Sequence, residues 1–420
     1  MESKLIDHLF RHHYGKMVSV LTRIFGLAHI ETIEDAVQDV FEKATVSWTH
    51  TMPDNPEAWL TQAAKNRVLD IFRKLKTQKK HVPQLSSGPS VIALNELFLD
   101  TEIEDSQLRM IFTACHPKLD PRDRIAFALK TVSGFSIKEI ASALLTKEDS
   151  IKKRIQRARK AIKKKDIHFA IPQGKELPKR NHSVLEVLYL IFNEGFHSNR
   201  KDVLVRKDLC GEALRLCQLM LKREATRSPN GYALLALMCF HAARLDSKVT
   251  DTNEIIDLKH QDRSKWHFPL VKLGNHAMEK AVMTEVFSHY HYEAAIAVEH
   301  LKAASFKDTN WEAIYNWYEA LYKLQPYPSI ALNMVMVQIQ RGNFEEAHDG
   351  LQQIEPADLE QRAYLYYGTY AEYYKLKGEV GKAVSCMELA LLAVQNDAER
   401  AYLENKKQEL ISLLSSHNTK

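Results

Sequence analysis

The stretch GFSIKEIASALLTKEDSIKKRIQRARKAIKKK, residues 134–165, decides how the rest of the chain is interpreted. Its pattern predicts two short helices joined by a tight turn, with Ser136 or Ile137 opening the first and Thr146 capping the second. The Thr146 hydroxyl can accept from the first amides of the second helix, and the Asp149 carboxylate complements the positive end of the helix dipole. This is the pattern of a helix-turn-helix, which presents its second helix to the major groove of DNA.

The second helix of this motif has two different faces. Its apolar residues recur at the helical period and should face the core: Ile151, Ile155, Ala158 and Ile162. The other side suits nucleic acid, because Gln and Arg read base edges and Lys holds phosphates. We therefore predict DNA contacts from Lys152, Lys153, Gln156, Arg157 and Lys160. A merely solvated basic helix is the alternative, but the small Ala141 at the expected helix crossing favours the DNA-binding motif.

Two runs of residues in this stretch carry a family resemblance. Gly134-x-Ser136-x-x-Glu139-Ile140-Ala141, followed by SIKKRIQRAR at residues 150–159, resembles the fourth conserved region of bacterial sigma factors. That region reads the promoter −35 element. The nearest match is the extracytoplasmic-function class, which keeps only the second and fourth regions. The resemblance implies a dissociable promoter-specificity subunit of RNA polymerase without catalytic residues or cofactors, whose partners are promoter DNA, the β′ coiled coil and the β flap.

Charge divides the chain into two parts. Residues 1–180 hold 31 Lys or Arg against 22 Asp or Glu, a net charge of +9, whereas residues 181–420 hold 27 against 31, a net charge of −4. At 420 residues and 45% hydrophobic content, the chain can fold into two or three domains. A basic front half and an acidic back half indicate a nucleic-acid-binding part joined to a part of another kind.

The cysteines and the apolar runs of the sequence indicate in which cellular compartment the protein is expected. The five cysteines are odd in number and contain no C-x-x-C pair, so neither a disulfide framework nor a zinc site is indicated. No signal pattern precedes Leu5, and the longest apolar runs are shorter than a membrane span. His8 and His12 have the spacing of a metal-binding pair but lack a partnering carboxylate. We expect a cytoplasmic protein with no membrane partner, no metal and no catalytic site, and therefore not an enzyme.

An acidic helix is predicted at residues 31–42, ETIEDAVQDVFE, which hold five carboxylates and no positive charge. Thr32 and Asp35 resemble a second cap, and an apolar stripe that includes Phe41 should be buried, leaving Glu34 outside. The stretch is similar to the sigma second-region helix that docks on the β′ coiled coil, for which an acidic face is suitable. The polymerase-binding residues that we predict are Asp35, Gln38, Asp39 and Phe41. An ordinary amphipathic helix is the alternative.

A second basic surface follows on a helix that Pro56 should open. Residues 65–80 hold seven positive charges against one carboxylate. The patterns Pro56-x-x-Trp59-Leu60 and Ala64-x-Asn66-x-x-x-Asp70-x-x-Arg73 look like the sigma segment that melts and reads the −10 element, where an amide can bind the edge of an extruded base. The residues expected to contact this element are Lys65, Asn66, Arg67, Asp70, Arg73 and Lys74. Solvated surface charges are the alternative.

The predicted fold is all-α, with six segments along the chain. Residues 1–80 form the first sigma module and residues 102–168 the helix-turn-helix module, joined by a linker at 81–101 that is rich in Pro, Gly and Ser. A second linker at 169–181 leads to a helical extension at 182–285, in which Gly195 should cap a helix after Asn193, and to helical repeats at 286–420.

The repeats are indicated by an internal echo. Gly342 and Ala347 recur as Gly378 and Ala383, a spacing of 36 residues, which resembles the helix-turn-helix unit of tetratricopeptide repeats. Aromatics between Trp311 and Tyr327 are expected to pack helices and could line a groove for a protein partner. The whole chain resembles extracytoplasmic-function sigma factors with such an extension, which we expect to regulate the modules in cis. The alternative is a stand-alone helix-turn-helix regulator with a sensing or interaction tail.

Overall fold

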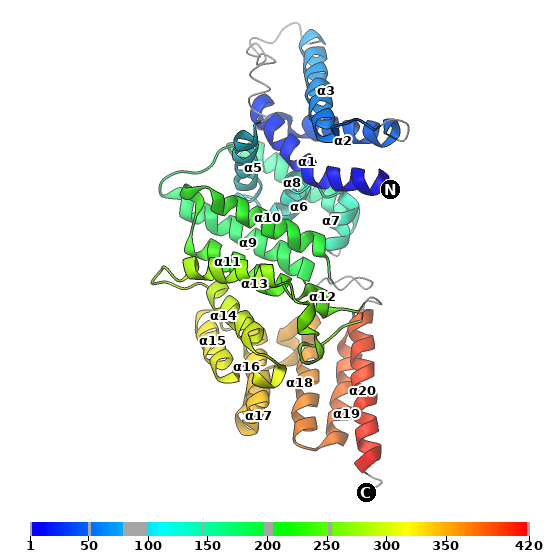
Figure 1. The fold of residues 1–420 in the computed structure, drawn as a ribbon, viewed down its shortest axis with the longest axis vertical. Coiled ribbons are helices and arrows are strands. Elements are labelled where there is room, and N and C mark those ends of the chain that lie inside the picture. The colour runs from blue at the N-terminus through cyan, green and yellow to red at the C-terminus, as the bar shows by residue number, and fades with distance from the viewer. Residues whose placement is uncertain are drawn as a thin grey trace. The chain divides into compact units, whose positions relative to one another are not determined.

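The fold of the chain is helical throughout the part that the structure describes (Figure 1). The structure is a computed structural model that describes residues 2–48, 52–78, 99–144, 146–196, 205–250 and 254–417. Within these residues the one extended pairing is an isolated antiparallel bridge between Val249 and Ile255. The chain divides into two compact units, Met1–Ile191 and Phe192–Lys420, which are described separately. The all-α prediction is confirmed.

The first module of the first unit consists of α1 (Glu2–Phe25), α2 (Ile30–Ser47) and α3 (Pro56–Gln78). Helix α1 ends before Gly26, whose φ of 92° lies in the region that only glycine adopts easily. The predicted cap at Thr32 is wrong, because α2 begins two residues earlier and Thr32 lies inside it. The core between the helices contains fully buried side chains: Tyr14, Met17, Leu21, Ile33 and Leu60.

The second module contains α5 (Asp100–Ala114), α6 (Pro121–Thr131), α7 (Ile137–Ala143) and α8 (Glu148–Lys164). Ser136 caps α7 as predicted, and Glu139 returns a carboxylate to the Ser136 amide at 2.8 Å. The predicted cap at Thr146 is wrong: Lys147 is the N-cap residue of α8, and its side chain accepts no capping hydrogen bond. The Thr146 amide instead donates to Ala141 O at 2.9 Å, which tightens the turn between the two helices.

The two modules of the first unit pack against each other through α1, which contacts both α5 and α6. Gly15 makes this approach possible, because a Cβ added there would lie 1.8 Å from Val132 O. Gly134, with a φ of 71°, brings the backbone against the Tyr14 ring. The Lys130 ammonium lies 5.1 Å from the centre of the same ring. Small residues therefore let the first module lie directly on the helix-turn-helix module.

Helix α9 (Glu176–Phe196) begins inside the predicted linker at 169–181, and the predicted cap at Gly195 is wrong because Gly195 lies within the helix. The first turns of α9 belong to the first unit. Arg180 donates to Phe112 O at 2.6 Å, and Ser183 donates to Cys115 O at 2.6 Å. Both donors are buried, so they satisfy carbonyls at the end of α5 that would otherwise be unpaired.

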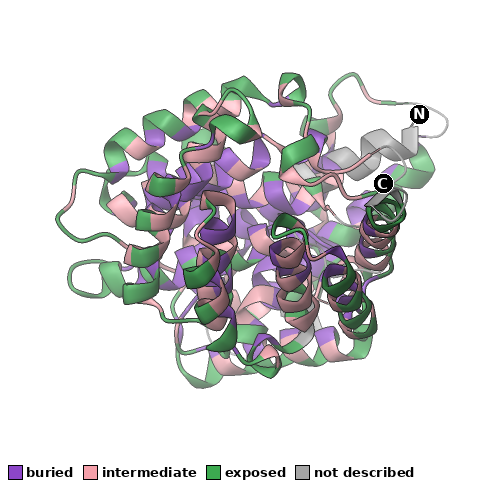
Figure 2. Cartoon of the chain, turned by 90° about the horizontal axis from the view of Figure 1, so that it is seen from below, coloured by how far each residue is buried: buried purple, intermediate pink, exposed green. Residues whose placement is uncertain are grey.

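The second unit continues as a series of antiparallel helices whose inner faces are buried (Figure 2). Gly195 near the end of α9 admits the Arg206 carbonyl and the Cys210 thiol of α10, which approach within 2.9 Å of where a Cβ would lie. The helices that follow are α10 (Lys207–Lys222), α11 (Pro229–Ala242), α12 (Leu245–Lys248), α13 (Phe268–Ala281), α14 (His289–Lys302), α15 (Trp311–Leu324), α16 (Pro328–Arg341), α17 (Phe344–Gln352), α18 (Ala363–Leu376), α19 (Val380–Ala393) and α20 (Asp397–His417).

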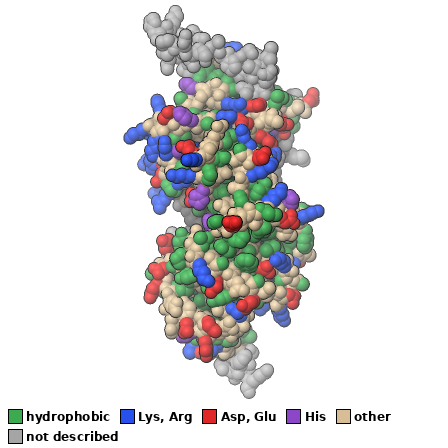
Figure 3. Space-filling view, turned by 90° about the vertical axis from the view of Figure 1, so that its left-hand side faces the viewer, with side chains coloured by type: hydrophobic (Ala, Val, Ile, Leu, Met, Phe, Trp, Pro, Cys, Tyr) green, Lys and Arg blue, Asp and Glu red, His purple; other side chains and the backbone are tan. Residues whose placement is uncertain are grey.

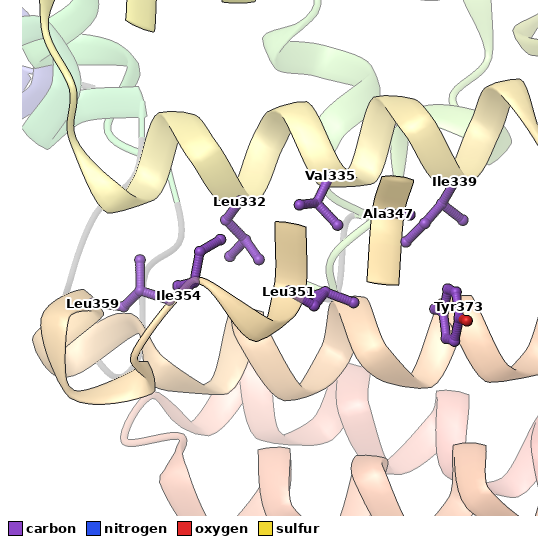
Figure 4. Close-up of a cluster of buried hydrophobic side chains, with 8 residues drawn as sticks. All are labelled: Leu332, Val335, Ile339, Ala347, Leu351, Ile354, Leu359 and Tyr373. Carbon is purple, nitrogen blue, oxygen red and sulfur yellow. The ribbon is translucent and has the colours of Figure 1, made fainter. Parts of the chain in front are cut away.

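The internal echo corresponds to two equivalent helix pairs, α16–α17 and α18–α19. Gly342 and Gly378 both have a φ of 80° and end the first helix of each pair. Ala347 and Ala383 are both fully buried, as small residues at a helix crossing should be. Figure 4 shows Ala347 in one apolar cluster, where α16 and α17 face α18 across side chains that include Leu332, Leu351 and Tyr373. Of the aromatics between Trp311 and Tyr327, Trp311, Tyr315 and Tyr318 pack helices as predicted, whereas Trp317, Tyr322 and Tyr327 are exposed.

Candidate DNA- and polymerase-binding surfaces

Helix α8 has the two faces that its sequence predicts. Ile151, Ile155, Ala158 and Ile162 are buried against α6 and α7, and the five residues predicted to contact DNA are all exposed. Lys152 lies 3.4 Å from Asp149 one turn earlier, an exposed pair that constrains little. Figure 3 shows Lys and Arg side chains gathered on parts of the surface drawn there.

Arg157 has a structural partner that the sequence did not predict. Its Nε and Nη2 donate to the two carboxylate oxygens of Asp123 at 3.0 and 2.6 Å. Asp123 is buried on α6, and its bidentate hydrogen bonds raise the pKa of Arg157. Arg157 therefore fastens α8 to α6, so of the predicted base-reading pair Gln156 is the one with no hydrogen bond among the described residues.

Three of the predicted polymerase-binding residues lie at the surface of α2. Asp35 and Gln38 are exposed, and half-exposed Asp39 accepts from Arg67 at 2.5 and 3.1 Å. Phe41 is buried, as its place in the apolar stripe predicts: only 3% of it is exposed, and its ring lies 4.8 Å from that of Phe10, so it does not form part of the exposed surface. The Asp39–Arg67 pair joins α2 to α3, and so connects the predicted polymerase surface with the predicted −10 surface.

The residues expected to read the −10 element lie along α3. Lys65 does not face solvent; it is 7% exposed, and burial lowers its pKa. Asn66 is exposed and accepts from Gln62 at 3.1 Å. Asp70 and Arg73 form an exposed pair at 3.6 Å, and Lys74 is exposed. Residues 49–51 of the preceding loop and the predicted linker up to Phe98 lie outside the described residues.

Helices α8 and α2 meet directly, which no local signal in the sequence indicated. Arg159 of α8 donates to Glu31 of α2 at 2.8 Å and also to Glu34. Glu34 was predicted to lie outside but is only 2% exposed. The pairing joins residues more than a hundred positions apart, so it could not be read from helix periodicity.

A cleft of about 240 Å³ lies beside this contact. Residues from the predicted polymerase surface and from the predicted DNA surface line it together: Asp35, Gln38, Lys152 and Gln156. Two surfaces that we expected to act on different partners therefore face each other. The tertiary structure brings them together because Arg159 crosses between the helices.

Burial governs the ionisation of the groups around Arg159. Burial raises the pKa of Glu34, while the positive charges of Arg159 and Lys130 counteract that effect. Burial likewise lowers the pKa of Lys130, which Glu34 opposes, and raises that of Tyr14. The opposite charges of Glu34, Arg159 and Lys130 therefore offset part of the cost that burial imposes on the charged forms of Glu34 and Lys130.

Comparisons with known proteins agree with this architecture. Residues 9–78 match sigma-70 region 2, and residues 109–162 match sigma-70, region 4. Residues 180–282 match a family of unknown function, DUF6596. The uncharacterized protein R00370 of Rhizobium meliloti (strain 1021) is 30% identical over 91% of this chain and 90% of its own length. The ferric citrate uptake sigma factor FecI of Escherichia coli (strain K12) is 28% identical over 37% of this chain and 87% of its own length. No solved structure matches.

The helix-turn-helix on a short helical module, preceded by a second helical module with its own basic helix, defines a promoter-recognition subunit of RNA polymerase. The chain belongs to the sigma-70 family of sigma factors, within the extracytoplasmic-function class, and carries a helical C-terminal extension that begins with the DUF6596 region. The stand-alone regulator considered above does not account for the region 2 match. Within the described residues, no helix is long and apolar enough to cross a bilayer, and no three His, Cys, Asp or Glu side chains form a metal-binding group.

Proposed function

We propose that α8 reads the −35 element, that the exposed polar face of α3 contacts the −10 element, and that α2 docks on the polymerase β′ coiled coil, with the β flap as the second contact on the core enzyme. The observation that carries the −35 assignment is the geometry of α8. Its apolar stripe is buried against α6 and α7, and Lys152, Lys153, Gln156 and Lys160 project from the opposite side. An exposed face of this kind can enter a major groove without unfolding the module.

The Arg159 contact supports a further part of the proposal, that the protein rests in a closed arrangement. In this arrangement α8 covers part of α2, so a polymerase helix and a promoter groove compete with the Arg159–Glu34 pair for the same surfaces. Binding of core polymerase must then separate the two modules. Such a contact reduces the apparent affinity to the intrinsic affinity multiplied by the fraction of molecules that are open.

We also propose that the C-terminal extension regulates these modules in cis and binds a protein partner through its helical repeats. Helix α9 supports the first point, because Arg180 and Ser183 fix the start of the extension to the helix-turn-helix module. A change in the extension can therefore reach the DNA-binding module through one continuous helix. The chain acts in the cytoplasm and carries out no chemistry of its own; its five cysteines are unpaired thiols, four of them buried.

Transcription by purified core polymerase on genomic fragments tests the proposal. Three proteins are compared: the full chain, a truncation after Lys165 and a truncation after Phe196, where α9 ends. The proposal expects promoter-specific transcripts only when this protein and core are both present, and a marked change in yield after either truncation. Equal binding of the free protein and of its complex with core to promoter DNA would count against the polymerase-dependent mechanism.

The two truncations separate regulation from stability. Cutting after Lys165 removes Arg180 and Ser183 and exposes the end of α5, whereas cutting after Phe196 keeps both residues. Regulation in cis predicts that the protein truncated after Phe196 differs from the full chain in transcription. The first unit of this truncated protein should melt at the same temperature as it does in the full chain. If only the shorter truncation differs from the full chain, the extension supports folding and does not regulate.

A further inference from the structure

A cluster of cationic and imidazole side chains lies inside the second unit, although residues 181–420 carry a net negative charge. His241 comes from the last turn of α11, and Arg244 is the N-cap residue of α12, which ends at Lys248. Arg263 begins the short helix η4 (Arg263–Lys265), and His300 lies in the last turn of α14. Nothing in the proposed sigma function uses these five residues. A gathering of basic groups inside a domain attracts anions.

Packing holds Arg263 in place from two sides. Its Nη1 donates to His300 O at 3.0 Å and also to Ala303 O, which caps the end of α14. Its guanidinium lies 4.6 Å from the centre of the Trp266 ring, and Trp266 in turn donates to Ser247 Oγ at 2.9 Å. The remaining nitrogen, Nη2, is buried without a hydrogen-bond partner. Arg263 is therefore fixed with one donor unused.

Arg244 and Lys248 are fixed in a similar way. Arg244 Nη2 lies 3.4 Å from His241 Nδ1, while its Nε is buried without a partner. The Lys248 ammonium lies 3.7 Å from the centre of the Phe196 ring and donates to Phe196 O. Neither Arg244 nor Arg263 forms an ion pair with a carboxylate in the part of the chain that the structure describes. Buried guanidinium groups are ordinarily paired.

The unused donors of Arg244 and Arg263, and a third on His300, belong to groups that interact electrostatically. Burial and then Arg263 lower the pKa of Arg244 to about 10. Burial, then Arg244 and Arg263, lower the pKa of His300 to about 3, and its Nδ1 is also buried without a partner. Arg244, Arg263 and His300 are therefore mutual neighbours. The two guanidinium charges repel each other and disfavour protonation of His300, while the Asp308 carboxylate opposes this effect at Arg263.

We propose that Arg244, Arg263 and His300, with Lys248 and His241 beside them, form a binding site for the phosphoryl group of a small molecule. The three unused donors, Arg244 Nε, Arg263 Nη2 and His300 Nδ1, can supply one hydrogen bond to each terminal oxygen of a phosphate monoester. Two rigid guanidinium groups suit phosphate better than ammonium groups do. A dianion compensates more of the clustered charge than a monocarboxylate can. The site makes the extension a receptor for a phosphorylated compound, independently of which promoter surfaces the modules use.

Thermal unfolding and calorimetry of the full chain test this site. Inorganic phosphate, sulfate and chloride are titrated at matched ionic strength. The expected result is a saturable rise in melting temperature with phosphate and sulfate but not with chloride. The Arg244→Gln variant should lose affinity at least tenfold, whereas Lys272→Gln, which removes one exposed charge from α13, should bind as the natural chain does.

The same Arg244 variant distinguishes a binding role from a structural one. Without added anion, Arg244→Gln removes an uncompensated buried charge, so its melting temperature should equal or exceed that of the natural chain. A residue that only supports the fold would lower the melting temperature when replaced, with or without anion. The Arg263→Lys variant gives a second check. It keeps the positive charge but loses the planar guanidinium with its paired N–H donors, so it should also bind anions more weakly.

Sulfate provides a pH test because its own charge does not change near neutrality. Burial and Arg244 lower the pKa of Lys248 to about 7, Arg362 acts in the same direction, and Glu399 and the Cys210 thiol oppose it. A bound anion favours the protonated ammonium, so binding takes up a proton. Affinity for sulfate should therefore rise as the pH falls from about 8 to about 6. A bound anion also favours proton uptake from solvent by the His241 and His300 imidazoles, which acts in the same direction.

Probe identity completes the test. Glycerol phosphate should bind at least as tightly as inorganic phosphate, because the proposed ligand is a phosphate monoester. Acetate should not bind. Tighter binding of acetate or citrate than of phosphate would overturn the phosphoryl assignment. Equal behaviour of phosphate and chloride, or of Arg244→Gln and Lys272→Gln, would show that no such site exists. These outcomes are independent of transcription, so they do not depend on the proposed sigma mechanism.

Discussion

Arg159 on the recognition helix α8 donates to both Glu31 and Glu34 on α2, the helix predicted to dock on polymerase. Glu34 is almost fully buried, and 19% of the Arg159 side chain is exposed, so water screens this pair little. A buried ion pair of this kind stabilises little in itself, but removing one partner leaves an uncompensated charge, at a cost of about 3–5 kcal/mol. The pair is therefore well suited to select one arrangement of the modules over others.

The Arg159→Gln variant should open the closed arrangement. It leaves the Glu34 carboxylate buried without its partner, so contact between α8 and α2 becomes unfavourable. Hydrogen exchange at α2 and α8 should increase, and affinity for core polymerase should rise because less work is needed to separate the modules. Lys163→Gln is the matched control, since it removes one exposed charge from the same helix. Unchanged exchange at α2 in Arg159→Gln would show that the contact does not hold the modules together.

Replacing Gln156 by Ala should reduce discrimination at one base pair of the −35 element by about 1–3 kcal/mol, because Gln156 is exposed and free to reach a base edge. Replacing Lys160 by Ala should weaken binding to all sequences alike and reduce the salt dependence, as the loss of a phosphate contact does. Promoter binding of the polymerase complex across a salt series separates the two effects. Identical selectivity profiles for the two variants would refute the assignment of Gln156 to base reading.

Asp39 has two possible roles, and a charge swap separates them. Asp39→Lys removes its pair with Arg67 and should weaken core binding if α2 docks on a basic polymerase helix. In the double variant Asp39→Lys and Arg67→Glu, the intramolecular pair is restored with reversed charges. Because both side chains are more than one-third exposed, the pair itself contributes at most about 1 kcal/mol.

Core affinity and melting temperature are measured for all three proteins. A docking role predicts that the double variant still binds core poorly while melting as the natural chain does. Full recovery of core affinity in the double variant would mean that Asp39 serves only to hold α2 against α3.

Arg180→Ala should destabilise the helix-turn-helix module even though Arg180 lies outside the matched region 4. The change leaves the buried carbonyl of Phe112 unpaired, at a cost of about 1–3 kcal/mol. The first unfolding transition should move to lower temperature, whereas Lys179→Ala, at the exposed neighbouring position, should leave it unchanged. Equal melting of the two variants would mean that α9 does not support the module.

Local pattern in the sequence was sufficient to identify the helix-turn-helix. The 3.6-residue spacing of Ile151, Ile155 and Ile162 fixes which side of α8 is buried, because one helix turn sets the relation between spacing and face. The glycines at 342 and 378 end helices for an equally local reason, since a left-handed residue is easiest for glycine. The sigma family, the all-α fold and the exposed basic face of α8 follow from features of this kind.

Only the tertiary structure decided how charged groups are paired. Glu34 lies at a position that a helical wheel leaves outside, and it is buried because α1 and α8 close over α2. Arg157 was predicted to read bases, and only the structure shows that Asp123 holds it; likewise, only the structure shows that the buried Phe41 packs on Phe10. These relations join residues that are distant in the chain, and periodicity within one helix carries no information about which partner a neighbouring helix will supply.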